Sequence, residues 1–226
     1  MIALTHSFGL SRDPFAQEIP VEELYPIPGL KAFKDRFRYA LDLPAATVIT
    51  GDVGSGKSTS LQAAVADLHP TQYVVLSLVA TSGSMMELLR QLCLELGGGG
   101  PTNSSAGLTR TIRDQLASIT EKKRIPVLVI DEAHLMRLDV FAQLHTLAQM
   151  PFDRKNLMPM VLSGQDMLVD RLLFHTSKPF ASRIVGRTHL VPLNLAKMGA
   201  DLAHLRKIVG GTPGRFGEEA VGARQQ

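Results

Sequence analysis

The sequence lacks three features that would place it in a specialised class of protein. Only one of its 226 residues is a cysteine, Cys93, so no disulfide can form within the chain. Its longest apolar runs, such as residues 127–130, fall far short of the roughly 20 residues that span a bilayer. The chain also has no large excess of charge of one sign, since 24 basic residues stand against 21 acidic ones and the net charge is +3. These absences exclude a disulfide scaffold, and they favour an ordinary globular domain.

The start of the chain has no secretory pattern. Residues 1–10 carry neither a basic start nor a long apolar core. A single cysteine also fits a reducing compartment. We therefore predict a cytoplasmic protein with no membrane among its partners.

Short apolar segments alternate with helical patterns between residues 46 and 192. We expect five strands, at residues 46–50, 73–78, 127–130, 160–163 and 188–191. Between them, apolar residues recur at helical spacing. Strands that alternate with helices predict an α/β fold, with a five-stranded, mostly parallel sheet flanked by helices on both faces.

A glycine-rich segment follows the first predicted strand and fits G-x-x-x-x-G-K-[ST] at every fixed position. Its residues are Gly51, Asp52, Val53, Gly54, Ser55, Gly56, Lys57 and Ser58, followed by Thr59. Glycine lets the backbone curl and aim its N–H groups at phosphate oxygens, and the following helix adds its positive N-terminal end. We predict that Lys57 reaches the β- and γ-phosphates of ATP. Ser58 is the expected Mg²⁺ ligand, with Thr59 as a weaker candidate.

Two acidic residues follow the predicted strand at 127–130. Asp131 can bind the Mg²⁺ shell, and Glu132 can polarise a water for attack on the γ-phosphate. The alternative for Glu132 is an acidic helix N-cap. In the sequence, the strand at 73–78 comes between the phosphate-loop strand and the acidic strand, which favours a water-activating ATPase over a small-molecule kinase. His134 is expected to cap or position the acidic loop.

Blocks of residues along the whole chain resemble the AAA+ ATPases of the ExeA-like branch. They are Phe8-Gly9-Leu10 with Pro14-Phe15, residues 51–58, 129–134 and 161–165, and Ser182-Arg183-Ile184 with Arg187. That branch includes secretion-assembly ATPases and ATP-binding helpers of transposition, with MuB, TnsC, TniB and IstB as functional relatives. The resemblance implies a P-loop NTPase fold of the AAA+/ASCE type, followed by a partial helical lid.

The resemblance also implies roles for single residues. Gln165 would be sensor 1, which orients the attacking water, with Ser163 as second choice. Arg183 would be the arginine finger that reaches the γ-phosphate of a neighbouring subunit, with Arg187 as the alternative. Either arginine could instead belong to a surface salt bridge. Tyr25 and Ile27 are expected to pack on the adenine.

Three parts of the chain are predicted from these patterns. Residues 1–45 form an N-terminal linker with a basic helix at about 30–41, and residues 46–192 form the AAA+ core. Residues 193–226 begin the helical lid, with helices at 196–209 and 216–223, and the lid is expected to be truncated. The sensor 2 arginine of the family would lie beyond this point, so no residue is assigned to it.

The leading hypothesis for function is an ATP-binding and ATP-hydrolysing regulator of DNA transposition. It would be a slow ATPase, stimulated by DNA or by assembly into a homo-oligomeric ring or filament. Its expected partners are a transposase and duplex DNA, contacted without sequence specificity through basic segments at 31–38, 121–124, 154–155 and 183–187. The alternatives are an ExeA-like secretion-assembly ATPase and a non-hydrolysing nucleotide switch.

Overall fold

The computed structural model describes residues 11, 20–25, 27–81, 83–98, 104–147 and 158–210. The chain divides into two compact units. The larger unit is Pro28–Val191, and the smaller one combines Met1–Ile27 with Pro192–Gln226. Each unit is described by itself.

The larger unit is built on one five-stranded sheet in the order β2-β3-β4-β1-β5. The strands are β1 (Ala46–Gly51), β2 (Tyr73–Val79), β3 (Ile125–Asp131), β4 (Met160–Gly164) and β5 (Ile184–Leu190). Every neighbouring pair is parallel, which confirms the predicted sheet. β1 and β4 are buried at every residue because helices cover both faces of the sheet.

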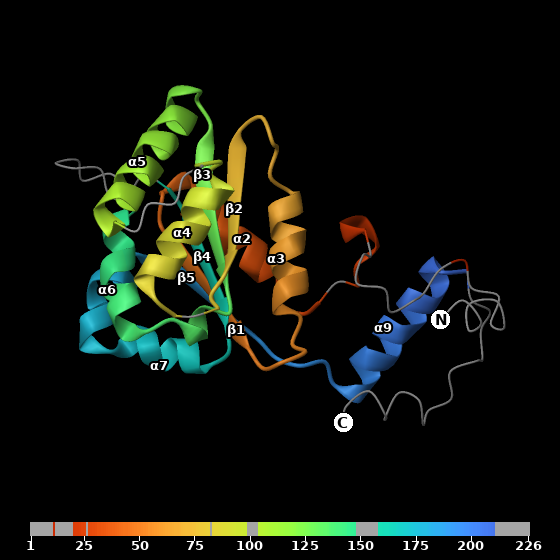
Figure 1. Ribbon diagram of the computed structural model, residues 1–226. Coiled ribbons are helices and arrows are strands. Elements are labelled where there is room, and N and C mark those ends of the chain that lie inside the picture. The colour runs from red at the N-terminus through yellow and green to blue at the C-terminus, as the bar shows by residue number, and fades with distance from the viewer. Residues whose placement is uncertain are drawn as a thin grey trace. The chain divides into compact units, whose positions relative to one another are not determined.

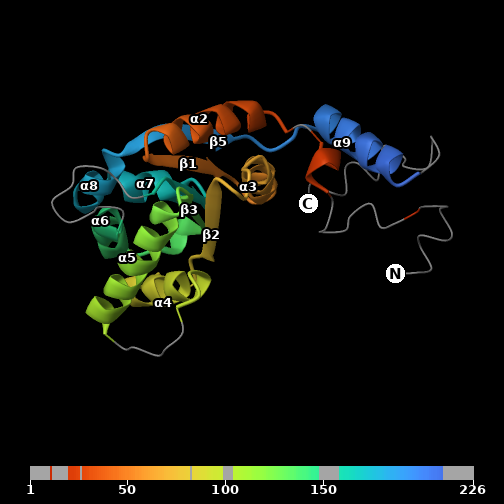
Figure 2. The same cartoon turned by 90° about the horizontal axis from the view of Figure 1, so that it is seen from above.

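The helices of this unit lie in two layers, one on each face of the sheet (Figures 1 and 2). Helices α4 to α8 cover one face, and α2 and α3 cover the other. Their bounds are α2 (Leu30–Asp42), α3 (Lys57–Ala66), α4 (Met85–Glu95), α5 (Ser105–Glu121), α6 (Leu138–Leu147), α7 (Met167–Leu173) and α8 (Lys178–Ala181). Two short 3-10 turns, η2 (Ala133–Leu135) and η3 (His175–Ser177), complete the α4–α8 side. The result is the three-layer arrangement expected from alternating strands and helices.

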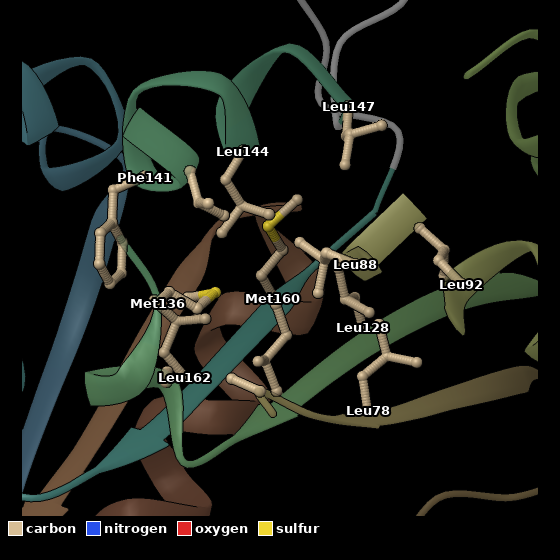
Figure 3. Packing of buried hydrophobic residues seen from close by; sticks show 14 of the residues in the cluster. Leu78, Leu88, Leu92, Leu128, Met136, Phe141, Leu144, Leu147, Met160 and Leu162 are labelled. Carbon is tan, nitrogen blue, oxygen red and sulfur yellow. The ribbon is translucent and has the colours of Figure 1, made fainter. Parts of the chain in front are cut away.

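The first core cluster fills the space between the sheet and the α4–α8 layer. Figure 3 shows Leu78, Leu128, Met160 and Leu162 of the sheet packed among apolar side chains of these helices. The strands contribute alternate residues to it, because successive side chains of a strand point to opposite faces. This packing fixes the acidic strand β3 between its neighbours.

The second core cluster lies on the opposite face, under α2 and α3. Phe33 and Phe37 of α2 are stacked, with ring centroids 6.1 Å apart, and both are almost fully buried. They pack with Ile49, Val129 and other apolar residues of the sheet. The structure therefore groups α2 with the sheet, whereas we predicted it as part of an N-terminal linker. The sequence pattern alone indicated a helix, but it did not show where the aromatic face of that helix would be buried.

The fifth strand begins four residues earlier than predicted, at Ile184 rather than 188. Only one face of β5 is buried, through Gly186, Thr188 and Leu190. The intervening residues, such as Arg187, are exposed. Gly186 and Arg187 interrupt the apolar run on which the prediction relied. A charged residue fits there because β5 is an edge strand with one face partly open to solvent.

The smaller unit contains η1 (Val21–Glu23) and α9 (Leu195–Ile208). α9 matches the helix predicted at 196–209, and the side chain of Asn194 caps it by accepting the N–H of Lys197 at 3.0 Å. Tyr25 packs edge-on against His204, whose Nε2 lies 2.8 Å from the carbonyl oxygen of Glu23. The helix predicted at 216–223 lies outside the described residues. Within the described residues, no helix is both long enough and apolar enough to cross a membrane.

Candidate functional site

The predicted phosphate and acidic residues gather at one edge of the sheet. Because all the strands are parallel, their carboxyl ends meet at this edge. The chain leaves β1 at Gly51, β3 at Asp131 and β4 at Gly164. The order of the sheet places β4 between β1 and β3. Residues that follow these three strands therefore face a common space.

The loop from β1 to α3 has the backbone that its glycines predict. Gly51, Gly54 and Gly56 have φ values of 153°, 78° and 88°, which L-residues rarely adopt. A Cβ on Gly51 would also lie 2.4 Å from the carbonyl oxygen of Leu190. The loop ends at the N-terminus of α3, where unpaired N–H groups and the helix dipole favour an anion.

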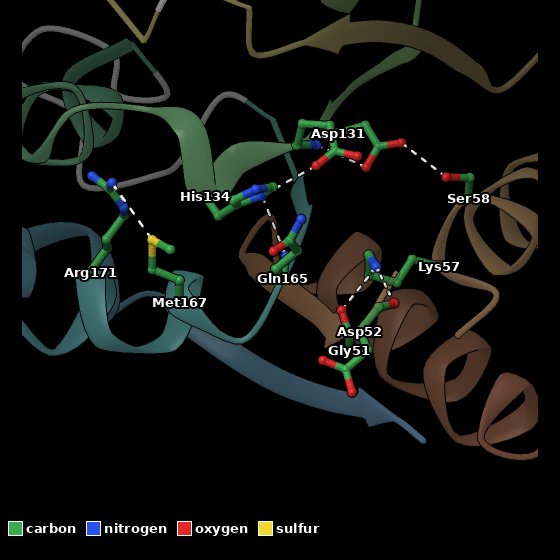
Figure 4. A network of polar contacts seen from close by, with 10 residues as sticks. Gly51, Asp52, Lys57, Ser58, Asp131, His134, Gln165, Met167 and Arg171 are labelled. Carbon is green, nitrogen blue, oxygen red and sulfur yellow. Dashed lines mark hydrogen bonds and ion pairs between the residues drawn. The ribbon is translucent and has the colours of Figure 1, made fainter. Parts of the chain in front are cut away.

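Lys57 points its ammonium group into this loop (Figure 4). Its Nζ donates to the carbonyl oxygens of Gly51 at 2.9 Å and Asp52 at 2.8 Å. The residue is only 9% exposed, and no carboxylate neutralises it among the described residues. The positive charge thus remains available to an incoming phosphate.

Ser58 and Asp131 form an oxygen pair next to the loop. The hydroxyl of Ser58 donates to Oδ2 of Asp131 at 3.2 Å, which joins the first turn of α3 to the end of β3. Mg²⁺ prefers oxygen ligands and is commonly held by one or two protein groups together with substrate phosphates. The described residues contain no cluster of three or more histidine, cysteine or acidic residues that would suit another metal. This pair therefore fits Mg²⁺, and Thr59 makes no contact that favours it over Ser58.

Glu132 follows Asp131 in a left-handed conformation, with φ 53° and ψ 30°. Its backbone N–H donates to Oδ1 of Asp131 at 2.9 Å. Its side chain is 41% exposed, and Oε2 lies 3.2 Å from Nδ1 of the buried His134. Glu132 occupies the N-cap position of η2, but its side chain accepts no capping hydrogen bond. The carboxylate is thus turned toward the ring rather than used as a cap, so this geometry does not support the N-cap alternative.

Of the two sensor 1 candidates, Gln165 lies just past the end of β4 and is partly exposed. Its backbone N–H lies 3.4 Å from Nδ1 of His134 (Figure 4). Ser163 is fully buried within the sheet. A side chain must reach the open edge to contact a water, so the geometry favours Gln165.

Arg183 lies at the opposite edge of the sheet. It precedes β5, and its carbonyl oxygen accepts the N–H of Ala46 at the start of β1 at 3.0 Å. Gly51 lies five residues further along β1, which places it about 16–17 Å away at about 3.3 Å per residue. Arg183 therefore cannot contact phosphates bound by its own loop. Arg187 lies on β5 and lines a groove of about 450 Å³ with Asp166 and Asp170.

Part of the basic character of α2 is offset by one nearby carboxylate. Lys34 and Arg38 both form ion pairs with Asp67, at 3.0 and 3.1 Å. Arg36 donates to the hydroxyl of Thr188 at 3.1 Å. In the segment 121–124, Arg124 donates to the carbonyl oxygen of Pro70 at 2.7 Å. One carboxylate thus offsets part of the charge of α2, whereas hydrogen bonds to a hydroxyl or a carbonyl oxygen leave the charges of Arg36 and Arg124 in place. Residues 154–155 lie outside the described residues.

One residue of this region was not singled out from the sequence. His189, at the end of β5, lies 3.1 Å from Oδ1 of Asp166 and 3.4 Å from the hydroxyl of Thr50. It therefore joins the ends of β5 and β1 to the segment after β4. An isolated histidine late in the chain gave no signal, because the partners that give it a place come from three separate segments.

The fold and this edge of the sheet define a P-loop protein of the AAA+ type. A family model described as "AAA domain" matches residues 42–172, which is more than half of the chain. The chain belongs to this family.

General secretion pathway protein A of Aeromonas hydrophila is 31% identical to this chain over 194 residues. The match covers 84% of this chain and 35% of that protein, so the chain spans about a third of the relative's length. Cdc6p from Pyrobaculum aerophilum has a TM-score of 0.67 at 14% identity, over 94% of this chain and 57% of that chain. The Aeropyrum pernix ORC1 protein in complex with DNA has a TM-score of 0.65 at 15% identity, over 89% and 54%. At these identities the two solved structures are evidence for the fold alone.

Proposed function

We propose that this chain binds ATP with Mg²⁺ and hydrolyses it to ADP and phosphate. The observation that carries the proposal is the convergence of Lys57, the Ser58–Asp131 pair and Glu132 at one edge of the sheet. Each group suits one requirement of phosphoryl transfer to water: charge on the phosphates, a metal ligand pair and a base beside the attacking water.

In this proposal the phosphates lie in the loop from Gly51 to Ser58, where backbone N–H groups and Lys57 hold them. Ser58 and Asp131 would hold the Mg²⁺, which neutralises phosphate charge when bound. Glu132 accepts a proton from the water as its oxygen bonds to the γ-phosphorus, and the bond from that phosphorus to the β-γ bridging oxygen breaks. Gln165 orients the same water from the end of β4. Arg183 serves a second copy, because it is too far from the phosphate loop of its own chain.

The sharpest test compares Glu132→Gln with Glu22→Gln. Glu132→Gln keeps the size of the side chain but removes the proton acceptor. We expect kcat for ATP hydrolysis to fall by about 10²–10⁴-fold while the Kd for ATP stays within about twofold. Glu22 lies in η1 of the smaller unit and serves as the control. ATP turnover that is equal in both variants would overturn the assignment.

For the biological role we propose first a secretion-assembly ATPase. The support is the relative named for the general secretion pathway, which is 31% identical to this chain. In this proposal the chain binds the membrane machinery through a partner protein. Fractionation of cells that express Glu132→Gln tests this role. We expect the variant to be recovered with the cell envelope. We also expect it to be lost from that fraction when a competing wild-type chain is added. Recovery only in the soluble fraction would count against it.

Regulation of DNA transposition is the second candidate. Its support is the resemblance of the sequence blocks described above to the branch that includes ATP-binding helpers of transposition. The ion pairs of Lys34 and Arg38 with Asp67 weigh against a strong basic surface on α2. Binding to random duplex DNA with ATP, with ADP and without nucleotide, at low and moderate salt, separates the two roles. Salt-sensitive binding that requires ATP supports the transposition role and an ATP-dependent oligomer on DNA, whereas indifference to DNA supports the secretion role.

A further inference from the structure

His134 lies at the junction of the two segments that carry Glu132 and Gln165. It belongs to η2, which follows β3, and it is only 5% exposed. Its ring lies against the end of β4: a Cβ on Gly164 would come within 3.2 Å of Nδ1 and 3.1 Å of the His134 backbone nitrogen. A side chain at position 164 would therefore press on the ring and shift it by a few tenths of an ångström.

A single atom of the His134 ring lies close to both Glu132 and Gln165. Nδ1 of His134 lies 3.2 Å from Oε2 of Glu132. The same atom lies 3.4 Å from the backbone nitrogen of Gln165 (Figure 4). An imidazole nitrogen either carries a proton and donates, or carries a lone pair and accepts, but it cannot do both. With a proton on Nδ1, the ring donates to Glu132. Without one, it accepts from Gln165 N–H and its lone pair faces the carboxylate.

The conformation of Glu132 makes this contact matter. Its left-handed backbone is uncommon for a residue with a side chain and is energetically unfavourable. The N–H bond to Asp131 fixes the backbone, but it leaves the carboxylate free to rotate. His134 is the contact that sets the direction of this carboxylate, while the exposed remainder of the group stays open to a water.

We propose that His134 is a positioning residue, which holds Glu132 in the orientation for water activation by donating from Nδ1 to Oε2. Through the same atom it links that orientation to the end of β4, because Gln165 N–H competes for Nδ1. The inference rests on the proposed ATPase activity and names a residue that acts on the reaction only through Glu132. It touches neither the phosphate loop nor the Ser58–Asp131 pair by any contact described above.

The first experiment measures kcat and KM for ATP in His134→Ala. A misplacement of about 1 Å costs roughly 10²-fold in rate, so we expect kcat to fall by about 10- to 100-fold while KM and the Kd for ATP change by less than about twofold. His134→Asn can place an amide N–H where Nδ1 lies, and it should recover most of the loss. His134→Gln carries its amide one carbon further out and should not recover it. The exposed His69, in the loop after α3, provides the control variant His69→Ala.

A double-mutant cycle separates positioning from a structural role. If His134 acts through Glu132, His134→Ala should lower kcat in the wild-type background and have almost no further effect in Glu132→Gln. Gly164→Ala supplies a second variant in case His134→Ala does not fold. It keeps the histidine but displaces the ring, so kcat should fall there as well.

The outcomes are distinct. Equal kcat in wild type, His134→Ala and Gly164→Ala overturns the role of His134 and leaves the ATPase proposal intact. Failure of His134→Asn to recover activity where His134→Gln does overturns the assignment to Nδ1. A wild-type chain that binds ATP but never hydrolyses it overturns both proposals.

Discussion

Gly51 and Lys57 show how single residues define the phosphate loop. Gly51 adopts a φ of 153° and passes so close to Leu190 that any side chain would collide with its carbonyl oxygen. The turn it allows directs two carbonyl oxygens at the ammonium group of Lys57. The lysine is thereby held in the loop before any phosphate arrives, which lowers the entropy cost of binding.

At this scale we predict that Lys57→Ala weakens ATP binding. A charge-assisted hydrogen bond contributes about 1.5–3 kcal/mol, so the Kd should rise by at least about tenfold. Calorimetric titration of ATP into the variant measures this. Lys31→Ala, which removes an exposed lysine of α2, serves as the control and should bind like wild type. Equal affinities in the two variants would contradict the role of Lys57.

At the scale of elements, α2 illustrates how a basic helix becomes part of the core. Its charged residues suggested a surface for phosphates, yet Lys34 and Arg38 are paired with Asp67 at the end of α3. Its opposite face places Phe33 and Phe37 against the sheet. Hydrophobic burial therefore decides where this helix lies, and the ion pairs only join it to its neighbour.

For α2 we predict that Phe37→Ala lowers the free energy of unfolding by about 3–5 kcal/mol, because a buried aromatic ring leaves a cavity. Urea denaturation followed by circular dichroism measures the change. Tyr39→Ala, on the exposed side of the same helix, should cost less than about 1 kcal/mol. A similar loss in both variants would mean that α2 is not anchored through its buried face.

A second prediction at this scale concerns α4. The hydroxyl of Ser84 accepts the N–H of Glu87 at 3.2 Å and caps the helix. Ser84→Ala should therefore lower the free energy of unfolding by about 1 kcal/mol, whereas Ser84→Asn, also a good N-cap residue, should keep most of it. Thermal melts of the two variants compare them. Equal stability would show that the cap contributes nothing.

At the scale of the whole molecule, the two core clusters lie entirely within Pro28–Val191. Every residue of the phosphate loop and of the acidic edge lies there as well. The smaller unit has contacts of its own, such as the edge-on packing of Tyr25 and His204. Most of the buried apolar core of the described residues, and the groups proposed for hydrolysis, therefore belong to the larger unit.

We expect the fragment of residues 28–191 to fold by itself. A chain of this size can bury about two thirds of the surface that it exposes when unfolded. The expected result is a single cooperative thermal transition, with near-native circular dichroism per residue. A broad, non-cooperative transition would show that the smaller unit is needed for folding. ATP binding by the fragment, compared with the full chain, then measures what the smaller unit adds.

The sequence determined the class of fold and predicted which groups lie at the carboxyl edge of the sheet. Short apolar runs between helical patterns predicted the five-stranded sheet, because strand and helix periodicities are local properties. The spacing of glycines, Lys57 and Ser58, and the acids after a buried strand, predicted the residues of the candidate site. The assignments of Gln165 and Arg183 came from family resemblance and stay predictions.

Tertiary structure alone decided which groups meet. Strand order brings β4 between β1 and β3, so that Gln165 reaches the ring of His134 although 31 residues separate them. Pairing of β5 with β1 places Arg183 at the amino ends of the strands, away from the phosphate loop, and Asp67 forms ion pairs with two basic residues of α2. Such contacts depend on packing between distant segments, and local sequence patterns carry no information about their distances. The same packing gives one buried nitrogen of His134 two competing neighbours.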